Sequence, residues 1–283
     1  MRHEVSVLTI AKGRRQHLSA LVEGLAGSST YPASFVLADF DDEPASLPAL
    51  PFSVEHIHRP AEGLPLAEAR NQAAALANTN FLAFLDVDCI PAPSFVSVMA
   101  DILMRENALV CCEVLYLPRG TERGLGAESL YQLGQRHPHR PFPRGTQREA
   151  NAGLFWSLAF GIRRSTFLSL GGFDTAFTGY GAEDTDFAFR AAKQGIPLIL
   201  TDETRVFHQY HQVFDPPLQH FADILANAQR FRARHGFWPM EGWLRSFATM
   251  GLIEWEPDGV LRLLRSPSRE EISSAAVSEE RPF

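Results

Sequence analysis

A short apolar run that stops at two aspartates limits the fold of this chain more than any other feature of its sequence. Every residue of Phe81–Leu85 is apolar, and Asp86, Val87 and Asp88 follow directly. A continuous apolar run of this length is typical of a strand that is buried on both faces of a sheet. Because side chains alternate along a strand, Asp86 and Asp88 are expected to lie on the same side. The run therefore predicts a central strand that ends in two carboxylates.

The chain before this run alternates between strand and helix patterns. Strands are expected at Val5–Ala11, at Ser34–Phe40 and, more weakly, at residues 54–59, with helices at His17–Leu25 and Leu66–Ala77. This order predicts an α/β fold with a mostly parallel central sheet flanked by helices. In such sheets, ligands bind beyond the carboxyl ends of the strands, which is where the acidic residues lie.

Glycine, proline and arginine are frequent from Leu117 to Ala150, a segment with one short helical pattern around Glu128–Arg136. An irregular segment of this length in a compact enzyme is typical of a lid or of disorder. We therefore expect a flexible lid over residues 116–150. Its arginines and histidines indicate either a solvated basic loop or a surface that recognises an anionic acceptor, such as a phosphate or a uronic acid.

Order is expected to return after the lid, with a helix at Glu183–Gln194. Residues 266–283 are rich in Ser, Glu and Pro, and we expect them to be disordered. The remaining residues 1–265 are expected to form a single domain, whose two halves are residues 1–115 and residues 151–265.

Charge and cysteine content exclude several classes of protein. The formal net charge of −7 provides no basic field that would attract nucleic acid. Three cysteines are too few for a disulfide framework. The apolar stretch Val5–Ala11 is too short for a signal peptide, and no run approaches the ~20 residues of a membrane-spanning helix. We expect a cytoplasmic protein with no transmembrane segment and no nucleic-acid partner.

Three polar groups are candidates for a functional site. Asp86 and Asp88 suit a hard divalent cation that shares its oxygen ligands with substrate phosphates, although aspartate also favours the turn after a strand. Glu183 and Asp184 begin a predicted helix, where acidic residues complement the helix dipole. Repulsion among Glu183, Asp184 and Asp186 also raises the pKa of one of these carboxyl groups, which suits a general base. His208 and His211 follow an apolar run, and either offers an imidazole ligand.

These segments, in this order, resemble one family of enzymes. The matching stretches are FLDVDCIP at residues 84–91, GGFDTAFTGYGAEDTDFAFR at 171–190 and FHQ at 207–209. They look like the inverting, nucleotide-sugar-dependent glycosyltransferases of the GT-A fold, specifically family 2, the chondroitin-polymerase-type transferases and the beta-1,4-galactosyltransferases. TIAKGRRQHL at residues 9–18 resembles the first donor-binding loop of these enzymes. GLPLAEARNQAAALA at 63–77 resembles the segment before their metal-binding strand.

The resemblance implies a set of residues that bind a nucleotide-sugar donor with Mn²⁺ or Mg²⁺. Asp88 is implied as a metal ligand, with His208 as the best match to the later ligand and His211 as the alternate. Asp86 is implied to face the donor ribose or a metal-bound water. The remaining donor-binding residues that the resemblance implies are Lys12, Arg14, Asp39 at the nucleobase, and Arg70.

The resemblance also implies how the acceptor is bound and activated. Asp184 matches the catalytic base, and Glu183 matches the carboxylate that positions a sugar. Tyr180 replaces the tryptophan that the family usually carries in this motif, so an aromatic wall is kept. We expect Tyr180 and Trp156 to contact a carbohydrate or another hydroxyl acceptor.

One base and no protein nucleophile predict a single displacement at the sugar, with inversion. A uridine diphosphate donor is expected from the resemblance alone. Two other classes remain open. A nucleotidyltransferase that makes nucleotide sugars should carry a longer glycine-rich basic loop than Lys12–Arg15. A non-catalytic carbohydrate-binding domain would explain Trp156, Tyr180 and Trp243 but not the acidic residues.

Overall fold

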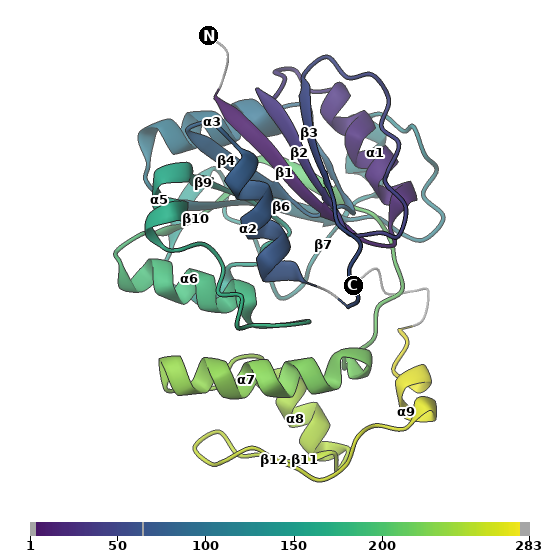
Figure 1. Ribbon diagram of the computed structural model, residues 1–283, viewed down its shortest axis with the longest axis vertical. Coiled ribbons are helices and arrows are strands. Elements are labelled where there is room, and N and C mark those ends of the chain that lie inside the picture. Colours follow the sequence, from purple (N-terminus) through teal and green to yellow (C-terminus); the bar gives the residue numbers. More distant parts are fainter. Residues whose placement is uncertain (1–3, 64, 278–283) are drawn as a thin grey trace.

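A computed structural model describes residues 4–63 and 65–277 of the chain. Its centre is a mixed sheet whose main path runs β3-β2-β1-β4-β9-β6-β10-β5 (Figure 1). Strands β3, β2, β1 and β4 are parallel, as are β6 and β10, whereas β9 lies between these groups and is antiparallel to both β4 and β6. The bounds are β1 Val5–Ala11, β2 Ser34–Asp39, β3 Ser53–His58, β4 Phe81–Leu85, β5 Cys89–Pro91, β6 Leu109–Tyr116, β9 Ala159–Arg163 and β10 Leu198–His208.

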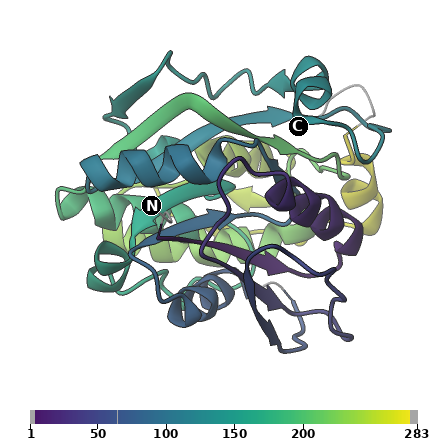
Figure 2. The same ribbon diagram turned by 90° about the horizontal axis from the view of Figure 1, so that it is seen from above.

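Helices cover both faces of this sheet (Figure 2). On one face, α1 (Arg15–Ala26) and α3 (Phe95–Arg105) bury leucines, phenylalanine and methionine against the odd-numbered residues of β1. On the other face, α2 (Leu66–Leu76), α5 (Arg164–Ser169) and α6 (Glu183–Lys193) share an apolar cluster with the even-numbered residues of β1, β2, β4 and β9. The burial of both faces explains why Phe81–Leu85 is apolar throughout, and it confirms the expected α/β architecture.

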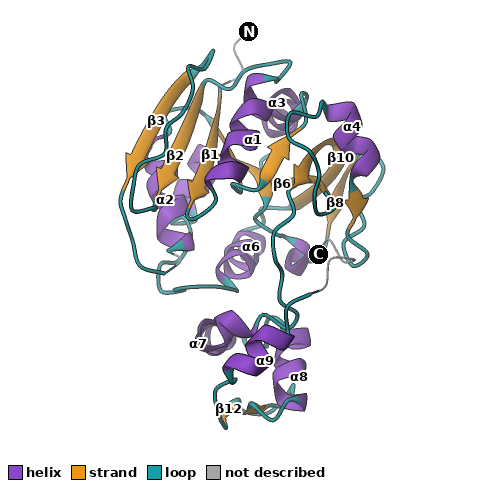
Figure 3. Cartoon of the chain, turned by 90° about the vertical axis from the view of Figure 1, so that its right-hand side faces the viewer, coloured by secondary structure: helices purple, strands orange, loops and turns teal. Residues whose placement is uncertain are grey.

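A helical segment follows β10 and forms a separate apolar cluster, centred on the fully buried Leu244, Phe247 and Leu252. Figure 3 shows this segment beyond the edge of the sheet, where α7 lies next to α6. Its elements are a 3₁₀ turn at Leu218–His220, α7 Phe221–His235, α8 Glu241–Thr249, β11 Ile253–Glu254, β12 Arg262–Leu263 and α9 Arg269–Ser274.

The segment expected to be a lid contains more regular structure than its composition indicates. It holds α4 (Ala127–Leu133), β7 (Gln135–Arg136) and β8 (Thr146–Glu149). β7 pairs with β6 and β8 pairs with β10, so backbone hydrogen bonds attach the segment to the sheet at two places. Leu130 adds an apolar anchor, because its side chain is buried beside β6 and β10. The mobility of the connecting turns stays a prediction.

The expectation of disorder after residue 265 is wrong for the part of that tail that the structure describes. Ser268 and Glu271 form a reciprocal capping box at the start of α9. Ile272 and Ala275 pack against the apolar cluster of the helical segment. The polar composition of this tail therefore gave no indication of its short amphipathic helix. Residues 278–283 lie outside the described residues. No helix among the described residues has the length and apolar character needed to cross a bilayer.

Candidate active site

A carboxylate and two imidazoles meet at the edge of the sheet. Asp88 follows β4 and is buried, and its Oδ1 lies 3.5 Å from Nε2 of His208. The other oxygen, Oδ2, lies 3.6 Å from Nε2 of His211. β10 brings His208 here because its last residues pair antiparallel with β5, with His208 opposite Cys89. Potential ligand atoms of Asp88, His208 and His211 lie within 4.8 Å of one another, which is compact enough to surround one metal ion.

The charge state of this cluster suits a cation. Burial lowers the pKa of His208, and it lowers that of His211 to about 4, so both imidazoles are neutral and keep a lone pair for a ligand. Burial alone would raise the pKa of Asp88, but charged neighbours, among them the permanently charged guanidinium of Arg14, outweigh burial and lower the pKa. Arg14 Nη1 lies 2.6 Å from Oδ2 of Asp88. Arg14 and a metal ion would therefore compete for the same carboxylate.

Arg70 connects the two acidic motifs that the sequence separates. This residue of α2 is only 3% exposed, and it donates to Oε1 of Glu183 at 3.0 Å and to Oδ1 of Asp86 at 3.3 Å. Burial raises the pKa of Asp86 to about 6. Burial, assisted by the charge of Asp184, raises the pKa of Glu183 to about 7. Arg70 opposes both shifts and so keeps the buried Glu183 and the partly exposed Asp86 within reach of ionisation near neutral pH.

Asp184 lies in the first turn of α6, where an unusual backbone presents it. Gly179, Gly181 and Ala182 all have positive φ angles, of +68°, +95° and +68°. Only glycine adopts such angles without strain, so Ala182 marks a turn that the surrounding structure enforces. The Asp184 carboxylate is partly exposed, and it accepts a bond from the backbone N–H of Ser157 at 3.4 Å. A proton acceptor is thereby held at an accessible helix N-terminus.

Two aromatic residues are close in sequence to the groups just described: Tyr180 belongs to the turn, and Trp156 precedes Ser157, which bonds Asp184. The ring of Tyr180 stacks on His220 of the helical segment, with centroids 4.4 Å apart and an angle of 15° between the planes. Trp156 lies under the guanidinium of Arg140 at 4.8 Å and against the ring of His137 at 4.9 Å. Arg140 and His137 belong to the segment expected to be a lid, so that segment contributes to the site through Trp156.

A cavity of about 550 Å³ lies at the start of α1, and of the expected donor-binding residues Arg14 alone lines it. Residues 13–17 and 41–43 line this cavity, and Arg14 is among them. Lys12 lies beside it and donates to the backbone carbonyl of Ala61. Asp39 is fully buried, and its carboxylate accepts the backbone N–H groups of Asp41 and Ala45. Asp39 thus fixes the loop that forms the wall, and a direct contact between Asp39 and a nucleobase stays a prediction.

Two contacts of the site have no signal in the sequence. Ser157 reaches Asp184 because β9 begins two residues later beside β4, and His220 reaches Tyr180 because α7 packs alongside α6. Both depend on the packing of distant segments. By contrast, Asp41 belongs to the acidic run after β2 and is visible as a candidate in the sequence.

Comparison with known families now assigns the chain. Residues 36–169 match the model described as glycosyl transferase family 2, and residues 145–212 match the one described as the N-terminal domain of galactosyltransferase. The chain belongs to glycosyltransferase family 2. The two matches span the carboxylate pairs and both histidines of the site, and they end before the helical segment.

Curated relatives of this family 2 chain include a validoxylamine A glucosyltransferase from Streptomyces hygroscopicus subsp. jinggangensis, 27% identical over 203 residues. That match covers 64% of this chain and 47% of the relative. An O-antigen biosynthesis protein, RfbC, from Myxococcus xanthus is 27% identical over 212 residues, covering 70% of this chain and 15% of the relative. The chain therefore spans less than half the length of these relatives.

Solved structures share the fold. The complex of residues 1–349 of S. aureus TarS with UDP-GlcNAc has a TM-score of 0.55 and 14% identity, covering 80% of this chain and 65% of that one. GalNAc-T7 with UDP, GalNAc and Mn²⁺ has a TM-score of 0.54 and 17% identity, covering 73% of this chain and 43% of that one. Together with the family match, these neighbours confirm the expected GT-A architecture.

Proposed function

We propose that this protein is an inverting glycosyltransferase that moves a sugar from a nucleoside-diphosphate donor, most readily a UDP-sugar, to a hydroxyl group of an acceptor. One observation carries the proposal. The Asp88–His208–His211 cluster and the Glu183–Asp184 pair occupy one site, with Arg70 bonded to both Asp86 and Glu183. A site for a cation and a proton acceptor are thus held side by side, as a single displacement at a sugar requires.

The metal cluster fits Mn²⁺ or Mg²⁺ through one carboxylate and neutral imidazoles, with substrate phosphates able to complete the coordination. Asp88 and His208 would hold the ion, with His211 as the alternate ligand. When bound, such an ion neutralises the negative charge that develops on the leaving diphosphate. Relatives support this assignment, because GalNAc-T7 was crystallised with UDP and Mn²⁺ and TarS with UDP-GlcNAc.

The chain's own residues supply the remaining steps of the proposed reaction. The cavity at the start of α1 binds the nucleoside, with Lys12 and Arg14 near it and Asp39 fixing its wall. Arg70 orients Asp86 toward the donor and Glu183 toward the sugar. Asp184 removes the proton of the acceptor hydroxyl as that oxygen attacks C1, and inversion follows because no protein nucleophile intervenes.

The acceptor is proposed to approach between Trp156 and Tyr180. Tyr180 belongs to the turn before Asp184, Trp156 precedes the Ser157 that bonds Asp184, and aromatic faces suit the apolar faces of a sugar ring. The guanidinium of Arg140, which lies over Trp156, brings a positive charge close to this wall and favours an acceptor that bears an anionic group.

The test is release of free nucleoside diphosphate from a panel of UDP- and GDP-sugars, with Mn²⁺ or with a chelator, in the presence of mixed sugar acceptors. We expect Mn²⁺-dependent release of UDP, together with a product whose anomeric configuration is opposite to that of the donor. Release of pyrophosphate from a nucleoside triphosphate and a sugar phosphate would instead identify a nucleotidyltransferase. Sugar binding without any release would identify a carbohydrate-binding domain.

The metal ligands have a separate test. Replacing Asp88 by Ala should abolish Mn²⁺-dependent binding of UDP in calorimetry, because the carboxylate that faces both histidines is lost. Asp202→Ala is the matched control and should bind UDP as the wild type does, because Asp202 is a partly exposed residue of β10 whose carboxylate accepts the backbone N–H of Gly145 and not a group of the cluster. Equal affinity of the Asp88 variant with and without chelator would refute the metal assignment.

A further inference from the structure

One face of α7 packs against the turn at residues 178–181, which precedes Glu183 and Asp184. The residues involved are Asp223 and Asn227 of α7 and His220, which caps its start; their spacing of three and four residues places them in a row. His220 stacks on the ring of Tyr180, and the Asp223 side chain packs against Gly179. All three residues lie beyond position 212, where the family matches end.

Asn227 makes the most specific contact of this face. Its side chain is completely buried, and its amide nitrogen donates to the backbone carbonyls of Thr178 at 2.9 Å, Tyr180 at 3.3 Å and Gly181 at 2.9 Å. Carbonyl groups that leave water need a donor, and a single buried amide here serves three of them. The turn is therefore bonded to α7 through one side chain.

Gly179 and Gly181 of the turn lie so close to the helical segment that neither position has room for a side chain. A Cβ atom on Gly179 would lie 2.2 Å from the Asp223 carboxylate, and one on Gly181 would lie 3.0 Å from Sδ of Met240. Both glycines also have positive φ angles. These glycines are thus required both by the backbone conformation and by the surface of the helical segment.

We propose that Asn227 is a positioning residue that holds the turn at residues 178–181 and thereby sets the place of Glu183 and Asp184. The turn ends at Ala182, and α6 begins at the next residue, so a displacement of the turn moves the first residues of the helix directly. A shift of about 1 Å in a reacting group lowers a rate by on the order of 10²-fold. The inference rests on the proposed function, because Asp184 matters here as the base.

The test compares Asn227→Asp and Asn227→Ala with the matched control Gln229→Glu. Asn227→Asp keeps the shape and the oxygen that faces Arg230 but replaces the donor by a second acceptor. Asn227→Ala removes the donor without adding a buried charge, and it serves if the aspartate variant does not fold. Gln229 lies on the exposed side of the same helix, so its amide-to-carboxylate change should have no effect. Each variant is assayed for UDP release, UDP affinity with Mn²⁺, thermal unfolding, and hydrogen exchange of peptides that cover residues 178–190.

We expect at least tenfold lower kcat in both Asn227 variants, with donor KM and UDP affinity within about twofold of the wild type. Amide exchange should accelerate over residues 178–186 and stay unchanged around Asp88. Normal kcat in a folded variant, or unchanged exchange at the turn, would overturn the role of Asn227. A lowered melting temperature with normal kcat would reduce Asn227 to a structural residue. A wild-type protein that releases no nucleoside diphosphate from any donor would instead overturn the proposed function itself.

Discussion

Buried ionisable side chains give this site its pH dependence at the scale of single residues. Glu183 has a pKa of about 7 in the folded chain against an ordinary value of 4.5, because burial and the charge of Asp184 disfavour its ionised form. Between these two values the folded state binds more protons than the unfolded state. The free energy of unfolding therefore falls as the pH rises from about 4.5 to 7 through this group.

Replacing Glu183 by Gln should remove this decrease in the free energy of unfolding, because the amide does not ionise. We expect the melting temperature of Glu183→Gln to exceed that of the wild type at pH 8, by about 3 °C or more, and to approach it at pH 5. Glu241→Gln is the matched control, because Glu241 is also the first residue of a helix that follows a left-handed residue but is exposed. A Glu183 variant that is less stable than the wild type at pH 8 would show that the ion pair with Arg70 outweighs the burial of its carboxylate.

Asp184 is expected to be the residue whose loss most affects turnover. Asp184→Asn keeps the shape and the contact with Ser157 but cannot accept a proton. UDP release in the presence of acceptor should fall by about 10²–10⁴-fold, with UDP affinity nearly unchanged. If Asp186→Asn showed this loss instead, while Asp184→Asn retained its turnover, the register of the acidic motif would be misassigned.

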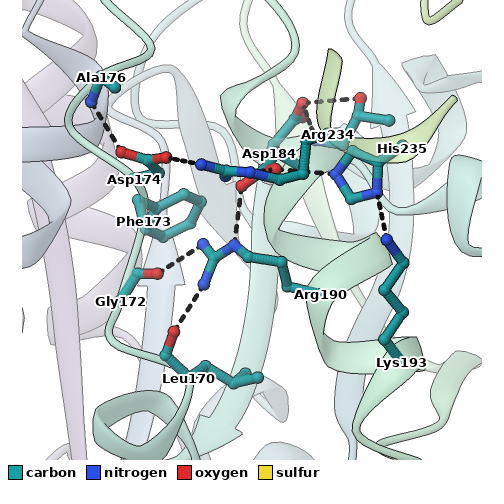
Figure 4. A network of polar contacts seen from close by, with 12 residues as sticks. Leu170, Gly172, Phe173, Asp174, Ala176, Asp184, Arg190, Lys193, Arg234 and His235 are labelled. Atoms are coloured by element: carbon teal, nitrogen blue, oxygen red, sulfur yellow. Dashed lines mark hydrogen bonds and ion pairs between the residues drawn. The ribbon is translucent and has the colours of Figure 1, made fainter. Parts of the chain in front are cut away.

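At the scale of elements, a buried ionic network joins α6 to α7. Asp186 is completely buried and lies 2.8 Å from Arg190 Nε, 2.8 Å from Arg234 Nη1 and 2.9 Å from His235 Nε2. Figure 4 shows the side chains of α7 and α6 that converge here, with Asp174 on the outer side of Arg234. The carboxylate is thus surrounded by partners from two helices, which fixes how these helices sit together.

Asp186→Asn should lower the free energy of unfolding by about 3 kcal/mol, because the completely buried group that Arg190, Arg234 and His235 all contact loses its charge and one of its two acceptor oxygens. Asp174→Asn is the matched control: Asp174 pairs with the outer side of the same arginine and is partly exposed, so its loss should be within about 1 kcal/mol. Urea unfolding measures both values. Equal losses in the two variants would mean that the network derives no stability from burial.

The sequence predicts the elements of this fold better than their pairing. Continuous apolar runs and helical spacing place β1, β2, β4, α1, α2 and α6 within a few residues of their true bounds. β7 and β8 are short and polar, and they are strands only because β6 and β10 offer them free edges. The acidic motifs are likewise visible in the sequence, whereas Arg70 reaches Glu183, which lies 113 positions further along the chain, only through packing of α2 against the sheet.

At the scale of the whole molecule, the helical segment and the sheet domain have separate apolar clusters but share a polar and aromatic boundary. Phe231 of α7 is buried with Phe177, and it lies edge-on to Phe189 of α6 at 5.7 Å. Asn227 and the Asp186 network cross the same boundary. Contacts of this kind couple the two parts, so neither is expected to unfold while the other remains intact.

Tryptophan fluorescence can test this coupling, because of the chain's four tryptophans only Trp156 lies outside the helical segment. In a Trp156→Phe variant, fluorescence follows the helical segment through Trp238, Trp243 and Trp255, whereas far-ultraviolet circular dichroism follows the whole chain. We expect both signals to give one coincident thermal transition. In the Asp186→Asn background the fluorescence transition should separate toward lower temperature, because the boundary has lost its buried ion pairs. Separate transitions without that substitution would show that the helical segment is an independent unit, and they would remove the physical basis for its control over the turn before Asp184.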